Sequence, residues 1–153
     1  QWPLEHWQGL IARLPAELSV VILGSQRDIA FGEAIAKAAK PGQSAINLCG
    51  QTTMAQAIAL IAGAQWLLSN DSGLMHVAAA LGKPQVAVFG STDPEHSGPM
   101  NPLAIVHRLK LECSPCFKRH CPLGHHRCMQ AIHPDVLAQD LRSLGRTETI
   151  LPS

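Results

Sequence analysis

Short apolar runs of strand length alternate with segments of helical spacing along the first 90 residues. The runs lie at 18–23, 46–49, 66–69 and 85–89. Consecutive parallel strands need crossover connections, and these are right-handed, so the alternation predicts a parallel sheet with helices on both faces. The expected fold class is α/β with a doubly wound, Rossmann-like sheet.

The expected helices follow from apolar residues spaced three or four positions apart. The dipeptide Pro41-Gly42 ends the second of them, and Gly145 is well placed to end the last. A loop rich in Pro, Gly and Ser at 90–102 separates the alternating part from the rest of the chain. The expected helices are 3–14, 28–39, 53–63, 74–81 and 134–144, and the expected late strand is 104–107.

Length and charge limit what the chain can be. A chain of 153 residues is long enough for one domain with a sizeable core, so we expect residues 1–153 to form one domain. Charged residues make up 15% and the formal net charge is +1, which excludes a nucleic-acid binder that relies on a basic stripe. No membrane-span run or signal-peptide pattern is present, which favours a soluble, cytoplasmic protein. The chain starts at Gln1 without Met, so we expect it to be part of a longer protein.

Four loops follow the expected strands at their carboxyl ends. They lie at 24–28, 50–53, 70–73 and 90–93. In open α/β sheets ligands bind beyond these ends, where helix N-termini present unpaired N–H groups and a positive dipole end. The four loops should therefore line one edge of the sheet, and that edge is the candidate binding site.

The third loop, in the sequence LLSNDSGLMHVAAALGKP, offers two kinds of contact. Gly73 lets a ligand approach the backbone, and the N–H groups of Ser72, Gly73 and Leu74 can face an anion. An ionised Asp71 only accepts hydrogen bonds, which suits sugar hydroxyls and not phosphate. His76 lies one helical turn after Ser72, so its ring can reach back over the loop. The simpler alternative is that Asp71 or Ser72 caps the helix and His76 is a structural, partly buried histidine.

Two further loops carry small polar residues. Thr52, Thr53 and Gln56 are candidates for contact with a nucleoside, and the alternative is a helix cap with an exposed face. Gly90, Ser91 and Thr92 form a second hydroxyl-rich turn, which is either part of the binding edge or a plain turn before a proline. The dinucleotide, P-loop and nucleophile-elbow signatures G-x-G-x-x-G, G-x-x-x-x-G-K-[ST] and G-x-S-x-G are absent at the expected strand ends.

A cluster of four cysteines has the spacing C-x2-C-x4-C-x6-C within residues 113–128. C-x2-C is a usual start of a zinc site, and four thiolates can close a tetrahedral structural site, although the later gaps are short for a zinc ribbon. Reduced cysteines in an ordered loop, or disulfides, are the alternatives, and the odd total of five cysteines speaks against a disulfide framework. The candidate metal ligands are Cys113, Cys116, Cys121 and Cys128.

The same segment is basic. Lys118, Arg119 and Arg127 are interleaved with the cysteines, beyond the expected binding edge. They are either placed to meet an anionic acceptor or simply solvated, as charges in a polar loop usually are.

The sequence from INLCGQTTMAQAIALIAGAQWLLSNDSGLMHVAAALGKP to QVAVFGSTDP resembles the donor-binding half of the ADP-heptose:lipopolysaccharide heptosyltransferases. The run 70–76 followed by the alanines at 78–80 is its most specific part. The resemblance implies a GT-B glycosyltransferase, with this chain as the C-terminal nucleotide-sugar domain. An N-terminal acceptor domain, absent here, would supply the catalytic base, so no catalytic residue is expected in this chain.

The resemblance also implies roles for individual residues. Ser72 and Gly73 would hold the diphosphate of ADP-heptose, Asp71 would take heptose hydroxyls, and His76 would support the loop. Transfer would be inverting and would require no metal cofactor. The acceptor would be the inner core of lipopolysaccharide, which is compatible with peripheral association at the inner face of the inner membrane.

Two positions depart from the family pattern. A phosphate-contacting lysine that the family carries just before the Trp-Pro pair is not in this chain, which begins one residue before that pair. Where some relatives have a ribose-binding glutamate, this sequence has Ala55 and Gln56.

Two other functions remain open. One is a non-catalytic, flavodoxin-like interaction module whose cysteine loop binds zinc, and the other is a nucleotide-sugar epimerase of similar architecture.

Overall fold

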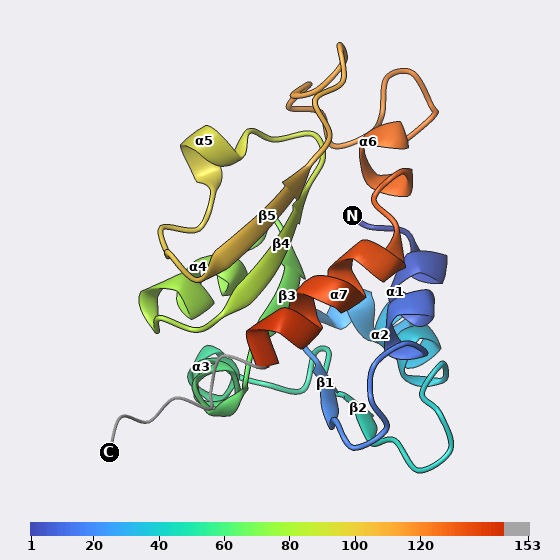
Figure 1. Ribbon diagram of the computed structural model, residues 1–153, viewed down its shortest axis with the longest axis vertical. Coiled ribbons are helices and arrows are strands. Elements are labelled where there is room, and N and C mark those ends of the chain that lie inside the picture. The colour runs from blue at the N-terminus through green and yellow to red at the C-terminus, as the bar shows by residue number, and fades with distance from the viewer. Residues whose placement is uncertain (146–153) are drawn as a thin grey trace.

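The computed structural model describes residues 1–145 and confirms the alternation of strands and helices (Figure 1). All strand pairs in this part of the chain are parallel. One sheet pairs β1 with β2, and the other has the order β3-β4-β5. The α/β class is therefore confirmed, but the strands form two separate hydrogen-bonded sheets. The strands are β1 Val20–Ile22, β2 Ala45–Asn47, β3 Leu67–Asn70, β4 Gln85–Phe89 and β5 Ala104–Arg108.

The predicted helices are present within a few residues of their expected limits. The first ends at Ile11 and not at Leu14, because the chain turns away after Ala12. Three single-turn helices were not predicted, since one turn is too short to show an apolar period. Among residues 1–145, no helix combines the length and apolarity needed to cross a bilayer. The long helices are α1 Leu4–Ile11, α2 Ile29–Ala36, α3 Met54–Gly63, α4 Gly73–Ala80 and α7 Pro134–Gly145; the short ones are η1 Gln26–Asp28, α5 Pro94–Ser97 and α6 Arg127–Gln130.

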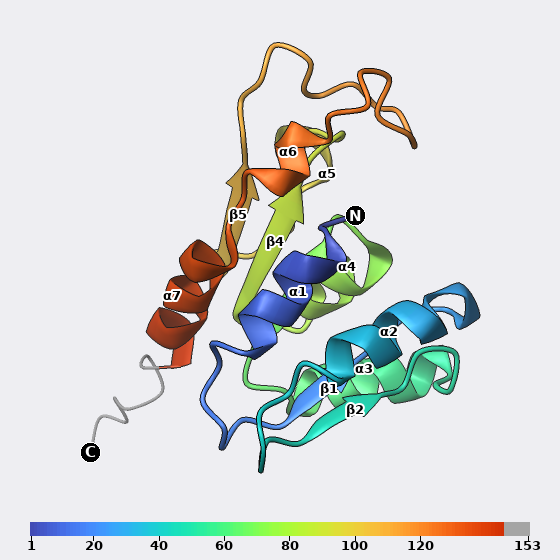
Figure 2. The ribbon, with the colours of Figure 1, turned by 90° about the vertical axis from the view of Figure 1, so that its right-hand side faces the viewer.

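Strand β4 is the centre of the core. All five of its residues are buried. Val86 and Val88 pack in the cluster that α1 and α7 form, whereas Ala87 and Phe89 pack with Met75 of α4. Figures 1 and 2 show α7 and α4 on opposite sides of this sheet. The prediction of a parallel sheet covered on both faces holds for β3-β4-β5.

The β1-β2 sheet differs from the prediction of a buried strand at 18–23. Val21 and Ile46 are paired in register, and their side chains are 42% and 49% exposed. Parallel strands are normally covered on both faces. Here α3 packs against α4, and β1 forms no ladder with β3 among the described residues, so this pair of side chains stays open to solvent.

Candidate functional site

The connection from β3 to α4 leaves the helix N-terminus open. Ser72 is the N-cap residue, with extended φ of −156° and ψ of 163°, and its side chain makes no capping hydrogen bond within residues 1–145. The backbone N–H groups of Ser72, Gly73 and Leu74 likewise have no acceptor among the described residues. Apart from its chain neighbours and the backbone of its own helix, no described atom lies within 4 Å of the position that a Cβ at Gly73 would take. The alternative in which Asp71 or Ser72 caps the helix by its side chain is therefore wrong.

At the connection from β2 to α3, local side chains accept hydrogen bonds from the N–H groups at the start of the helix. The N–H of Gln56 donates to Thr53 Oγ1 at 3.3 Å, and the N–H of Thr53 donates to Gln56 Oε1 at 2.8 Å. This is a capping box, so the simpler interpretation of the Thr53 loop is confirmed. Thr52 and Gln56 also line a shallow hollow of about 440 Å³ together with Leu60.

The turn after β4 is fixed by the segment that follows β5. The Ser114 hydroxyl donates to the carbonyl of Gly90 at 2.6 Å, and the N–H of Phe117 donates to the carbonyl of Ser91 at 2.7 Å. A Cβ at Gly90 would lie 2.5 Å from the sulfur of Met129 in α6. Gly90 therefore permits the close approach of α6, which is a packing role that the sequence did not reveal.

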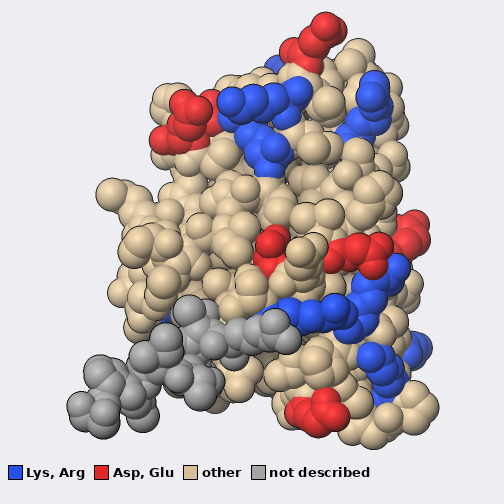
Figure 3. Space-filling model, in the orientation of Figure 1, with Lys and Arg blue, Asp and Glu red and all other residues tan. Residues whose placement is uncertain are grey.

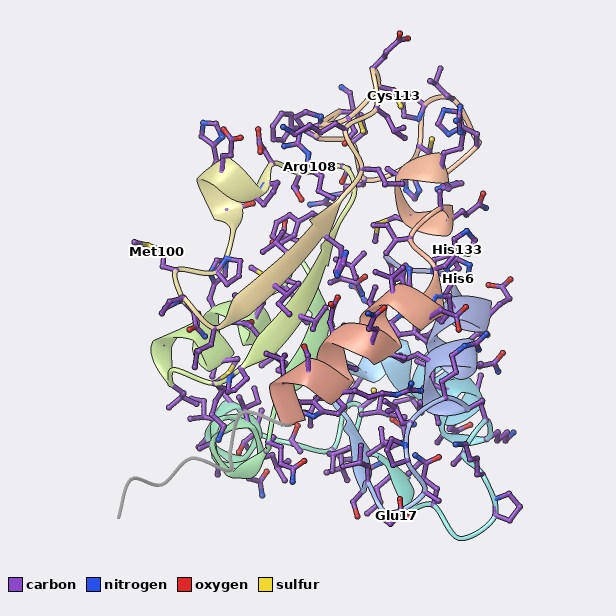
Figure 4. All side chains as sticks on the ribbon, viewed as in Figure 1. His6, Glu17, Met100, Arg108, Cys113 and His133 are labelled. Carbon is purple, nitrogen blue, oxygen red and sulfur yellow. The ribbon has the colours of Figure 1, made fainter. Side chains whose placement is uncertain are left out.

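An ion pair that sequence reasoning missed supports the same turn. Arg108 Nη1 donates to Asp93 Oδ1 at 2.7 Å, and both side chains are largely buried. Arg108 also reaches the carbonyl of Ser114 at 3.4 Å, and the Asp93 carboxylate caps α5 through the N–H of Glu95. Figure 4 shows Arg108 at the end of β5, below the segment that carries Cys113. No motif surrounds Arg108 in the sequence, so nothing there signals this role.

A cavity of about 210 Å³ lies at the carboxyl ends of β3 and β4. Its walls come from the strand ends, including Asp71, and from residues 113–128, which we call the cysteine segment. Gly90, Ser91 and Thr92 line it as well. Ser72, Gly73, Leu74 and His76 are not among its lining residues, whereas Asp71, directly before Ser72, is. The His76 side chain is exposed and makes no hydrogen bond within residues 1–145.

Trp2 holds the first residues of the sequence at the carboxyl end of β3. Its backbone N–H donates to Asn70 Oδ1 at 2.9 Å, and its indole N–H donates to the carbonyl of Ile132 at 2.8 Å. The Trp2 side chain is almost fully buried. Gln1 consequently lines the cavity.

All five cysteines, which lie in the described part of the chain, are free thiols. Backbone N–H groups, that of His126 foremost, hydrogen-bond the sulfur of Cys121 and lower its pKa. Burial raises the pKa of Cys128, and the charges of the other three clustered thiols raise it further. Within residues 1–145, no three metal-ligating side chains are arranged to hold an ion. Within residues 1–145 the cysteines form no disulfide, and zinc binding by Cys113, Cys116, Cys121 and Cys128 stays a prediction.

These features define a Rossmann-like α/β domain whose ligand edge carries an uncovered helix N-terminus. Residues 1–127 match glycosyltransferase family 9 (heptosyltransferase), and the chain belongs to this family.

Relatives agree with this assignment. The chain is 37% identical over 153 residues to lipopolysaccharide heptosyltransferase 2 of Salmonella typhimurium, aligning 98% of this chain with 44% of that protein. It is also 37% identical over 147 residues to lipopolysaccharide heptosyltransferase 2 of Escherichia coli, covering 94% of this chain and 42% of the relative. The chain spans less than half the length of these relatives.

Solved structures give the same picture. The fold matches ADP-heptose lipopolysaccharide heptosyltransferase II of Escherichia coli with a TM-score of 0.83 and 35% identity, over 98% of this chain and 43% of that chain. An Escherichia coli heptosyltransferase solved with ADP matches with a TM-score of 0.70 and 23% identity, over 94% of this chain and 40% of the other. The second likeness supports the fold alone.

Proposed function

We propose that this chain is the nucleotide-sugar domain of an inverting heptosyltransferase that transfers heptose from ADP-heptose to the lipopolysaccharide inner core. The observation that carries the proposal is the uncovered N-terminus of α4 beside the Asp71 carboxylate. Membership of the heptosyltransferase family supports it. The similarity to the ADP-heptose lipopolysaccharide heptosyltransferase II of Escherichia coli, at 35% identity, supports the choice of donor.

The diphosphate of the donor is assigned to the N-terminus of α4. The N–H groups of Ser72, Gly73 and Leu74 need an acceptor, and the positive end of the helix dipole favours an anion there. Donors that are already in place stabilise the charge that develops on a departing diphosphate without reorganisation. Because these groups can supply the stabilisation, the proposed reaction requires no metal cofactor.

The heptose and the nucleoside of the donor are assigned to opposite sides of the diphosphate. Asp71 accepts hydrogen bonds from heptose hydroxyls, and Ser91 and Thr92 lie on the same sugar side, in the cavity. Thr52 and Gln56 contact the nucleoside in the shallow hollow at α3. Thr53 keeps the structural role of a cap, and His76 supports the loop from the exposed face of α4.

No residue of this chain is assigned as the catalytic base. The base and the main acceptor contacts are proposed to belong to a separate acceptor-binding domain. Because nucleotide sugars are cytoplasmic and the acceptor is anchored in a membrane, the reaction is placed at the cytoplasmic face of that membrane. The chain alone should then bind donor and transfer no heptose, and measurable turnover by it would contradict the assignment of the base.

Calorimetry with ADP-heptose, ADP and a UDP-sugar tests the donor assignment. The unmodified chain should bind ADP-heptose most tightly and the UDP-sugar least. Asp71→Ala should weaken binding of ADP-heptose by about tenfold, the loss of one hydrogen bond to a charged group, and leave ADP binding unchanged. Asp135→Asn, on an exposed carboxylate that pairs with Arg13, is the matched control.

Two results would contradict the proposal. Equal affinity for all three ligands, unchanged in Asp71→Ala, would remove the donor site. Stoichiometric zinc in the purified chain together with no nucleotide binding would favour an interaction module instead.

A further inference from the structure

The cavity at the carboxyl ends of β3 and β4 has two walls of different chemistry. The strand-end wall carries Asp71, which is the single carboxylate among the described residues that line the cavity. The opposite wall belongs to the cysteine segment and carries Lys118 and Arg119, the two Lys or Arg side chains of the lining. His125 and His126 lie on the same wall. One side of the cavity can therefore accept hydrogen bonds, and the other can donate them with positive charge.

The cationic wall is held in place by hydrogen bonds. The N–H of Phe117, directly before Lys118, donates to the carbonyl of Ser91, and the Ser114 hydroxyl donates to the carbonyl of Gly90. Arg108 joins this wall to the β4 turn through Asp93 and the carbonyl of Ser114. Two consecutive cationic residues therefore follow a segment that is anchored to the rim of the site.

The charges on this wall have no partner among the described residues. Neither Lys118 nor Arg119 has a hydrogen bond or an ion pair within residues 1–145, whereas Arg13 and Arg108 are paired with carboxylates. Figure 3 shows Lys and Arg side chains at the upper end of the molecule, in the region of the segment that joins β5 to α6. Arg127, a third cation of the segment, does not line the cavity.

The cavity lies beside the donor site that is proposed above. The donor diphosphate is assigned to Ser72, Gly73 and Leu74, none of which lines the cavity. The cavity lies on the Asp71 side, where the sugar is assigned. Transfer takes place at the sugar, so an acceptor has to approach from this side.

We propose, resting on the function proposed above, that Lys118 and Arg119 bind an oxyanion of the acceptor saccharide next to the hydroxyl that receives the sugar. The planar guanidinium of Arg119 presents paired N–H donors to a carboxylate or a phosphate, and the Lys118 ammonium adds a point charge. Asp71 on the facing wall repels the same anion. The two walls together therefore orient the acceptor, with its anion toward the cysteine segment and its hydroxyls toward the donor.

A pair of monosaccharides that differ in one carboxylate tests the proposal. The chain is titrated with methyl α-D-glucuronoside and with methyl α-D-glucoside, with and without ADP, and amide shifts of residues 113–128 are followed by NMR. The glucuronoside should bind saturably and the glucoside should not. The double variant Lys118→Gln, Arg119→Gln should weaken glucuronoside binding by at least about tenfold, because two charge-assisted hydrogen-bonding groups are lost. Arg127→Gln, which removes a cation of the same segment outside the cavity, should leave binding unchanged.

Inorganic phosphate in place of the glucuronoside distinguishes the two sources of the oxyanion. Tighter binding of phosphate, lost in the same double variant, assigns a phosphate group of the acceptor, and tighter binding of the glucuronoside assigns a carboxylate. Equal shifts with the glucuronoside and the glucoside, or glucuronoside binding that survives in the double variant, would overturn the proposal. ADP affinity of the same proteins is a separate readout: its absence defeats the proposed function, whereas retained ADP binding without anion binding defeats only this inference.

Discussion

Two strand-to-helix connections differ in whether side chains cap the N-terminus of the helix. At the N-terminus of α3, Thr53 and Gln56 exchange hydrogen bonds and occupy each other's N–H groups. At the N-terminus of α4, the N–H groups of Ser72 and Gly73 have no acceptor among the described residues. Both connections carry hydroxyl residues, so their composition is similar.

The difference lies in which groups satisfy the helix N-terminus. A capped helix needs no ligand to satisfy the capped N–H groups and presents its own side chains to a ligand. An uncapped helix leaves donors that an anion can satisfy. This difference underlies the proposal that α4 binds the diphosphate and that α3 presents a surface for the nucleoside.

The largest expected effect comes from removing one N–H of α4. Proline is tolerated at the first helical position, and Ser72 already has the extended conformation that proline requires of its predecessor. Gly73→Pro should bind ADP about tenfold more weakly than Gly73→Ala, since a charge-assisted hydrogen bond is lost. Calorimetry measures the difference. Both variants add a Cβ where the structure has open space, so they differ in the N–H and in the proline ring carbons that replace its hydrogen. Equal ADP affinity of the two variants would show that this N–H does not bind the diphosphate.

The next effect distinguishes two alanine variants: one should lose stability, and the other should lose affinity for ADP. Thr53→Ala should lower the free energy of unfolding by about 1 kcal/mol, the usual cost of losing an N-cap side chain, with ADP affinity unchanged. Ser72→Ala should change the free energy of unfolding by less than about 0.5 kcal/mol and weaken ADP binding, because the hydroxyl makes no cap but is free for the ligand. Urea denaturation and ADP titration of both proteins provide the test. A large loss of stability in Ser72→Ala, with ADP affinity unchanged, would mean that α4 is capped like α3.

The smallest expected effect concerns the reactivity of Cys121, whose sulfur is hydrogen-bonded by backbone N–H groups. At neutral pH, Cys121 should react with iodoacetamide faster than Cys128, because the pKa of Cys121 is lowered by N–H groups and that of Cys128 is raised by burial. As the pH rises, the rate at Cys121 should level off first. Cys49 should be slowest, since it is buried and its pKa is raised. Peptide mapping by mass spectrometry measures each rate, and faster alkylation of Cys128 at pH 7 would contradict the geometry of the segment.

The local features of the site were predictable from the sequence. Asp71, Ser72 and Gly73 follow a strand and begin a helix, and the period of the flanking apolar residues places them at the ligand edge. Strand β4 was predicted residue for residue, because the four apolar residues 86–89 and Gln85 before them are bounded by Pro84 and Gly90, which leaves little freedom.

The non-local features were not predictable. The pair of Arg108 and Asp93 joins the end of β5 to the turn after β4, and no sequence spacing indicates it. The cavity depends on the cysteine segment folding back over Gly90, which follows from the bonds of Ser114 and Phe117 and from the packing of Met129. The exposure of Val21 depends equally on where α3 packs.

An NMR titration of the labelled chain with ADP tests the central claim most directly, because it observes the backbone N–H groups themselves. We predict that the amide resonances of Ser72, Gly73 and Leu74 shift most, and that pyrophosphate at higher concentration reproduces these shifts. The amides of Thr53 and Gln56, which are already bonded to each other's side chains, should move little with pyrophosphate. Unchanged α4 amides at saturating ADP, or pyrophosphate shifts confined to the α3 connection, would contradict the account.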